Sequence, residues 1–171
     1  MRRDRYAALP REVGVIRTAR IGGGFLPDGH LLPKPEWLEP NKEDQADAKV
    51  SGRAPGISVW EVPGAQHVSA CWIREVDDRG QRSFVAGVDS IQAVASTHAR
   101  ELGVVADPLD HPAEDDRWMT LTSDFQQGVR DTADKHSLIE GIKRPAGMAE
   151  KEHRSFREEL ARAFSLFSDA S

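Results

Sequence analysis

Apolar residues in the middle of the chain change their spacing several times, and each change predicts a new element. Residues 57–62 are rich in β-branched side chains that partly alternate with polar ones, which predicts a strand ended by Pro63 and Gly64. Residues 65–76 carry apolar side chains at helical spacing and predict a helix. A short apolar run at 83–88 then predicts a second, buried strand.

A helix with marked ends follows this second strand. Asp89 and Gln92 have the three-residue spacing of a capping box, in which each side chain bonds an amide at the start of a helix. Gly103 is the residue type that most often adopts the left-handed conformation after a helix. The sequence therefore predicts a helix over 90–102, and the apolar residues 104–106 predict another strand.

The C-terminal part of the chain is predicted to be mainly helical. After a strand at 118–122, apolar residues keep an approximate helical phase over 125–142, and a Pro/Gly break follows at 145–147. A clearer amphipathic helix is predicted over 148–167. Its apolar stripe is a candidate docking surface made of Phe156, Leu160, Phe164 and Phe167.

Residues 1–56 have a different composition. They contain three successive glycines at 22–24 and several prolines, so the sequence predicts an extended segment with little regular structure. The polar stretch 41–53 predicts a mobile linker. A disordered tail rarely carries many large apolar groups, so we expect an arm that lies on a surface of its own domain or of a partner. Its candidate binding residues are Phe25, Leu31, Trp37 and Leu38.

These elements predict an α+β fold. A small mixed β-sheet covered by helices would occupy residues 57–145. An extended Pro/Gly-rich N-terminal arm and linker over 1–56 and a C-terminal amphipathic helix over 146–171 would flank it.

Composition adds a few constraints. The chain has 171 residues, a size that suits one domain with an extension. Cys71 is its single cysteine, so an intrachain disulfide is excluded and a reducing, cytoplasmic location is expected. Neither a signal-peptide segment nor an apolar run of membrane-spanning length is present.

Charge is distributed unevenly. The net charge is -5, but residues 1–35 carry +4 and the rest -9. A basic arm can attract an acidic partner or nucleic acid, whereas the mild overall charge argues against a general nucleic-acid binder. The basic residues considered for such contacts are Arg2, Arg3, Arg5, Arg17 and Arg20.

One acidic stretch, 107–116, is a candidate metal site. Carboxylates and an imidazole suit Mg²⁺, Mn²⁺ or Zn²⁺. The spacing matches neither an EF-hand nor a zincin helix, and the alternative is a solvated loop between strands. The candidate ligands are Asp107, Asp110, His111 and Glu114.

Other chemical motifs are weaker. His67, Cys71 and Glu75 are spaced by four on a predicted helix, but a single helix face seldom converges on one reacting atom. His98 lies on the apolar side of the helix at 90–102, where a hydrogen-bonded core histidine is expected. The glycines at 22–24 lack the flanking residues of a P-loop or dinucleotide loop, so no cofactor is predicted.

Part of the chain resembles a set of short bacterial proteins to which no function is assigned. The resemblance is carried by residues 26–31 (Leu-Pro-Asp-Gly-His-Leu), by Ile57-Ser58-Val59, and by the later strand that leads into a helix. It extends loosely to Thr122 and implies a bacterial origin.

The first functional hypothesis is a non-catalytic accessory or adaptor protein of a bacterial multi-gene system, which binds another protein through the arm and the last helix. The alternative is a small metal-dependent hydrolase or nuclease that uses the acidic loop at 107–116. A toxin or antitoxin component is a further alternative.

Overall fold

A computed structural model describes residues 4–25, 31–75, 80–109 and 123–167. Its fold is α+β, as predicted. The predicted strand at 118–122 lies outside the described residues. The strands are β1 (Gly14–Phe25), β2 (Leu31–Pro33), β3 (Gly56–Val62), β4 (Gln81–Gly87), β5 (Gly103–Ala106), β6 (His136–Glu140) and β7 (Ser165–Leu166). The helices are α1 (Lys42–Ser51), α2 (Gln66–Glu75), α3 (Val88–Thr97), α5 (Ser123–Asp131) and α6 (Glu150–Ala163), with 3-10 turns η1 (Pro35–Leu38) and η3 (Ala133–Lys135).

Strand β1 lies in the interior of the sheet, whose order is β5-β6-β3-β1-β4-β7, with β2 paired to the C-terminal part of β1. Val15 and Ile16 are both 0% exposed, so β1 is covered on both faces. The N-terminal segment is therefore extended, but over β1 it belongs to the sheet. The pairings between these strands are antiparallel, where the sequence predicts a mixed sheet.

The prediction of a linker over residues 41–53 is wrong, because this stretch forms helix α1 (Lys42–Ser51) with a capping residue at each end. The side chain of Asn41 accepts from the Asp44 amide at 2.8 Å, and the Asp44 carboxylate accepts from the Asn41 amide at the same distance. Gly52 ends α1 in the left-handed conformation, with φ at 70°. A capping box and a C-terminal glycine were thus present in a stretch whose polar composition concealed them.

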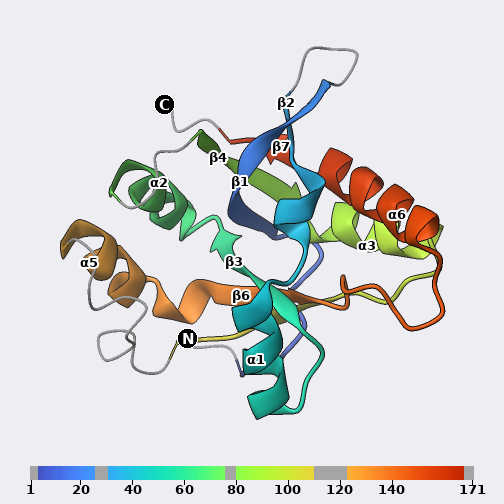
Figure 1. Cartoon of the computed structure of the whole chain (residues 1–171). Coiled ribbons are helices and arrows are strands. Elements are labelled where there is room, and N and C mark those ends of the chain that lie inside the picture. The colour runs from blue at the N-terminus through green and yellow to red at the C-terminus, as the bar shows by residue number, and fades with distance from the viewer. Residues whose placement is uncertain (1–3, 26–30, 76–79, 110–122, 168–171) are drawn as a thin grey trace.

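Helices cover the two faces of the sheet differently. Figure 1 shows α2 and α5 on one side and α3 and α6 on the other, with α1 below the first pair. We call these the α2/α5 face and the α3/α6 face. The α3/α6 face holds the larger apolar cluster, which includes Val15, Ile57 and Phe84 from the sheet. The cluster on the α2/α5 face is smaller and includes Ile16 and Trp60.

The predicted strands 57–62, 83–88 and 104–106 correspond to β3, β4 and β5, and the predicted helix 65–76 to α2. The prediction of a capping box at the start of α3 is wrong. The N-cap is Gly87, and no side chain caps it. The Asp89 carboxylate instead pairs with Arg11 at 3.1 Å, and the Gln92 amide donates to the Leu102 carbonyl at 2.9 Å.

Helix α3 also ends earlier than predicted. Ala99, not Gly103, takes the left-handed conformation, with φ at 51°. The Arg100 amide donates to the Ala95 carbonyl at 2.8 Å, and the Ala99 amide donates to the Ser96 carbonyl at 3.1 Å. These two bonds form a Schellman motif, which satisfies the last carbonyls of the helix.

The C-terminal third departs most from the prediction. The predicted helix over 125–142 is correct only for α5, because β6 occupies residues 136–140 and pairs with both β3 and β5. Four of the five β6 residues are buried. The predicted helix over 148–167 corresponds to α6, which ends at Ala163, and β7 then extends the edge of the sheet beside β4.

Among the described residues, none of the helices combines the length and the apolar character that a bilayer crossing requires.

Candidate functional site

The α2/α5 face is incompletely covered, and a cavity of about 840 Å³ lies there. Strands β3 and β6 form its floor, α1 forms one wall, and α2 with α5 forms another. Small-molecule sites typically occupy roughly 300–1,000 Å³. The cavity therefore has the size of a ligand site.

Ser58 and His136 meet on the cavity floor because of the strand register. The β3–β6 pairing places Ser58 opposite Leu138 and Trp60 opposite His136, so Ser58 and His136 are diagonal neighbours on one face. The Ser58 Oγ lies 2.5 Å from the His136 Nε2. The His136 ring is 6% exposed and packs edge-on against Trp60, with the ring centres 5.0 Å apart.

The other ring nitrogen of His136 fixes its tautomer. Nδ1 lies 2.8 Å from the main-chain carbonyl oxygen of Asp107. A carbonyl oxygen only accepts hydrogen bonds, so in the neutral ring Nδ1 carries the hydrogen. Nε2 then has a lone pair and accepts from the Ser58 hydroxyl.

Asp107 follows β5 directly and supports the imidazole from behind. Its amide donates to the His136 carbonyl at 2.9 Å, which continues the β5–β6 pairing. Its carboxylate lies 3.4 Å from the His136 Nδ1 and 3.6 Å from the Arg5 Nε. Asp107 thus offers His136 both a carbonyl and a carboxylate.

Arg17 places a positive charge beside Ser58. The registered pairs between β1 and β3 end at Ile16 and Trp60, and Arg17 follows at that point. Its guanidinium donates to the Ser58 carbonyl at 2.7 Å and to the Trp37 carbonyl at 3.0 Å. Burial lowers the pKa of Arg17 from its ordinary value, and the charge of Asp44 opposes this effect.

The α1 wall of the cavity is acidic. Burial is the main cause that raises the pKa of Asp44, while the Asn41 amide and the charge of Arg17 lower it. The neighbouring carboxylates Asp47 and Glu43 raise it further.

The opposite wall of the cavity is aromatic. Trp72 of α2 and Phe125 of α5 pack edge-on with ring centres 5.3 Å apart, and both line the cavity. Trp60 adds a third aromatic ring at the floor. A ligand in this cavity would therefore meet apolar rings on one side and charged groups on the other.

Half of the predicted docking residues are inside the fold. Leu38, Phe156, Leu160 and Phe164 are each at most 1% exposed and belong to the cluster on the α3/α6 face. They are corrected from docking residues to core residues, because α6 buries its apolar stripe against its own sheet. The other four have different environments. Trp37 packs against that cluster and also lines the cavity, and Phe167 packs against the cluster on the α2/α5 face. Leu31 is half-buried in β2, and the Phe25 side chain lies outside the described set.

The candidate metal loop is mostly outside the described residues. Of its four proposed ligands, Asp107 alone is described, and Asp110, His111 and Glu114 are not. Within the described ranges, no group of three or more His, Cys, Asp or Glu residues is placed to hold a metal ion. The metal hypothesis for the complete loop stays a prediction.

The predicted His–Cys–Glu face of α2 shows no reactive pairing in its described part. The Cys71 Sγ accepts from Arg74 at 3.3 Å, and His67 lies beside Gly128 of α5. His98 is at the C-cap of α3, where its Nε2 bonds the Glu159 carboxylate and its ring packs edge-on against Phe156. His98 is thus a hydrogen-bonded residue at the edge of the core.

The basic residues of the N-terminal segment are partly used within the fold. Arg5 pairs with Asp107, the half-buried Arg17 donates to two main-chain carbonyls, and the Arg20 guanidinium lies 5.5 Å from the Trp37 ring centre. Arg2 and Arg3 are outside the described residues. Nucleic-acid binding through this segment stays a prediction, and Arg17 is not available for it.

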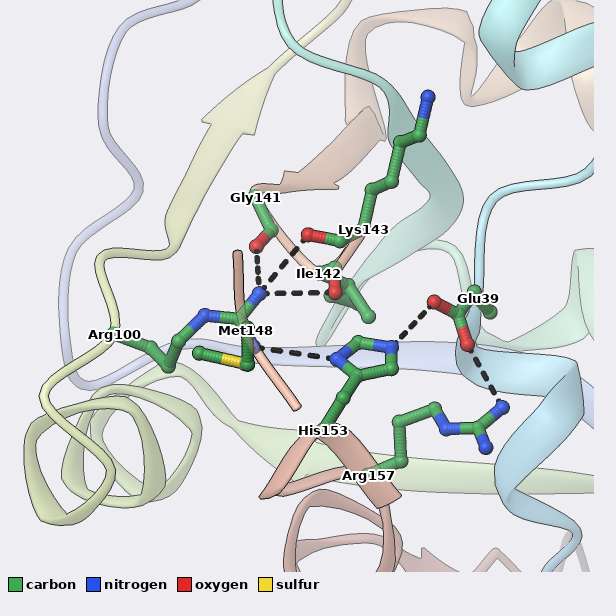
Figure 2. A network of polar contacts seen from close by, with 8 residues as sticks. All are labelled: Glu39, Arg100, Gly141, Ile142, Lys143, Met148, His153 and Arg157. Carbon is green, nitrogen blue, oxygen red and sulfur yellow. Dashed lines mark hydrogen bonds and ion pairs between the residues drawn. The ribbon is translucent and has the colours of Figure 1, made fainter. Parts of the chain in front are cut away.

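A second polar network lies away from the cavity, at the edge of the α3/α6 face. Figure 2 shows the Arg100 guanidinium pointing at three carbonyl oxygens, those of Gly141, Ile142 and Lys143, at 2.8, 3.0 and 3.1 Å. Gly141 has φ at 97°, and a Cβ there would lie 2.5 Å from the Glu101 carbonyl oxygen. Arg100 therefore ties the end of α3 to the segment that follows β6.

His153 extends this network to the N-terminal part of the chain. Its Nδ1 lies 3.4 Å from Arg100, and its Nε2 lies 2.6 Å from the Glu39 carboxylate, which also accepts from Arg157 at 2.8 Å (Figure 2). His153 is 5% exposed. The network joins η1, α3 and α6, and its groups are directed at one another, which is typical of a structural role.

No protein-family model matches the sequence, and neither the curated proteins nor the solved structures gave a match.

The sequence pattern indicates Asp107 as a candidate site residue but gives no signal for its partners. Ser58 and His136 are 78 residues apart, and neither lies in a catalytic motif. Ser58 lies in a predicted strand and His136 in a predicted helix, so nothing in the sequence pattern connects the two residues. Only the pairing of β3 with β6 shows that they are neighbours.

Proposed function

We propose that this protein binds a small organic molecule in the cavity on the α2/α5 face. The observation that carries the proposal is the cavity itself. Its volume is about 840 Å³, and Ser58, Arg17 and Trp72 all line it. Apolar walls with a few fixed polar groups are the usual composition of ligand sites. A ligand with an aromatic or apolar part and at least one polar group fits this lining.

The accessory-protein hypothesis stays a prediction. Its docking stripe on α6 is buried, so that helix gives it little support. The hypotheses of a metal-dependent enzyme and of a toxin or antitoxin component also stay predictions.

Binding is tested with three small aromatic compounds of different charge: indole, benzamidine and benzoate. Ligand-observed NMR with the full chain would measure each Kd. We expect at least one compound to bind below about 10 mM, which corresponds to about 3 kcal/mol of binding free energy. If none of the three binds below that concentration, the proposal is wrong.

Two alanine-to-phenylalanine substitutions test where the ligand binds. Ala54 is exposed and lines the cavity, so Ala54→Phe should fill part of the space and weaken binding about tenfold, or 1.4 kcal/mol. Ala93 is an exposed residue of α3 on the other face, and Ala93→Phe is the matched control with an unchanged Kd. Equal Kd values for the two variants would place the ligand elsewhere and contradict the proposal.

A further inference from the structure

Ser58 has the surroundings of an activated hydroxyl. Its Oγ is 2.5 Å from the His136 Nε2, and the Asp107 carbonyl holds the proton of the neutral ring on Nδ1. Nε2 is therefore placed to accept the hydroxyl proton. A serine paired with a histidine that a third group orients is the arrangement that activates a nucleophile.

A second serine in the same cavity gives an internal comparison. Ser69 of α2 also lines the cavity, but its hydroxyl bonds the Ser83 hydroxyl at 2.8 Å in a buried pair. A hydroxyl partner is a much weaker base than an imidazole. Of these two serines, only Ser58 has its hydroxyl hydrogen-bonded to an imidazole that can act as a base.

We infer that Ser58 is the nucleophile and His136 the general base of an acyl-transfer site that hydrolyses small carboxylic esters. The inference rests on the proposed function, because the ester must occupy the cavity. The aromatic rings of Trp60, Trp72 and Phe125 would hold an apolar or aromatic group of the ester.

The chemical steps balance with water as co-reactant. The Ser58 Oγ forms a bond to the ester carbonyl carbon while its proton moves to the His136 Nε2. The bond from that carbon to the alcohol oxygen then breaks, and the alcohol leaves with the proton from His136. Water next forms a bond to the acyl carbon while one of its protons moves to the His136 Nε2. The bond between that carbon and the Ser58 Oγ then breaks, Oγ takes the proton from His136, and the carboxylic acid leaves.

Arg17 provides a suitable charge for the negative intermediate. Its guanidinium donates to the main-chain carbonyl of Ser58 at 2.7 Å, and both residues line the cavity, so the cavity holds a cation next to the residue that would carry the acyl group. A fixed cation there stabilises the negative oxygen of the intermediate more than the neutral ester carbonyl.

The test uses the full chain with an alkyl fluorophosphonate, which forms a bond from phosphorus to an activated serine oxygen and releases hydrogen fluoride. Intact mass and peptide mapping would identify the labelled residue, and release of p-nitrophenol from p-nitrophenyl acetate would measure turnover. We expect one label on Ser58 and measurable release. No label on Ser58, or no release above the rate in buffer, would overturn the inference.

Three variants separate chemistry from folding. Ser58→Ala should lose label and turnover, and His136→Gln should slow both by about 100-fold or more. Ser96 is an exposed serine of α3 on the other face of the sheet, so Ser96→Ala should keep both within about twofold. Thermal unfolding would confirm that each variant folds. A Ser96→Ala variant that loses label as completely as Ser58→Ala would overturn the assignment.

The NMR compounds distinguish this inference from the proposed function. If the wild type binds one of them and Ser58→Ala binds it equally, while the wild type is not labelled, the binding proposal stands and the catalytic inference fails. If neither binding nor labelling is found, both fail.

Discussion

The two faces of this sheet use polar groups in different ways. On the α3/α6 face, apolar side chains fill the space between sheet and helices, and the polar network of Arg100, His153 and Glu39 is closed on itself at the edge. On the α2/α5 face, Ser58 and His136 lie on the floor of an open cavity.

This difference separates stability from binding within one small domain. The face with the larger buried apolar cluster contributes more of the burial free energy, whereas the larger cavity on the other face lowers that contribution but leaves room for a ligand. Substitutions on the two faces should therefore differ in how much stability they remove.

Phe84→Ala should cause the largest loss of stability. Phe84 of β4 is 1% exposed in the cluster on the α3/α6 face, so its removal leaves a closed void. We expect the free energy of unfolding to fall by about 3–5 kcal/mol, measured by urea denaturation. Val50→Ala is the surface control, because Val50 is 90% exposed. A loss below about 1 kcal/mol for Phe84→Ala would contradict a closed α3/α6 face.

Arg100→Leu should cost about 3 kcal/mol, because three carbonyl oxygens and the His153 ring lose a charged donor. Arg11→Leu is the matched control: Arg11 is 72% exposed and pairs with an equally exposed Asp89, so a change of about 0.5 kcal/mol or less is expected. Thermal and urea unfolding would measure both. Similar losses for the two variants would show that the network of Figure 2 is not structural.

Leu138→Ala should cost only about 1 kcal/mol. Leu138 of β6 is half-buried on the cavity floor, so its truncation removes apolar contact without creating a closed void. Urea denaturation beside Phe84→Ala would compare the two faces directly. A loss as large as that of Phe84→Ala would mean that the α2/α5 face is packed as tightly as the other.

Asp44→Asn should have the smallest effect, and it should depend on pH. Burial raises the pKa of Asp44 above its ordinary value of 3.8, so the folded state holds this proton more tightly than the unfolded state. The stability that this group contributes is present below pH 3.8 and decreases as the pH rises through the folded-state pKa. Asparagine keeps an oxygen acceptor for the Asn41 amide but has no charge.

The stability of Asp44→Asn relative to wild type should therefore increase between about pH 4 and pH 7. Urea midpoints at several pH values in this range would measure it. A difference that stays constant, or that decreases with pH, would contradict the expected direction.

Several elements were predictable because their signal is local. β3, β4, β5 and α2 each combine a suitable residue composition with a nearby break, and they occur where the sequence places them. The end of α3 was not predictable in this way, because Ala99 adopts the left-handed conformation, which glycine adopts far more often than alanine. Asp89 similarly has the spacing of a cap but pairs with Arg11, which lies 78 positions away.

The candidate site was much less predictable than the fold class. The sequence predicts Asp107 as a metal ligand, and in the structure its carbonyl and carboxylate oxygens lie beside the His136 Nδ1. Ser58 and His136 were not considered, and the helical phase assigned to residues 125–142 hid the strand on which His136 lies.

By itself the sequence determined that the chain alternates helices and strands and forms an α+β domain, because periodicity and turn residues act over a few neighbours. The tertiary structure decided that β1 lies inside the sheet, that α6 buries its apolar stripe, and that Ser58 and His136 share a cavity floor. These outcomes depend on which strands pair and in what register, and pairing energies between segments far apart in sequence leave no local pattern to recognise.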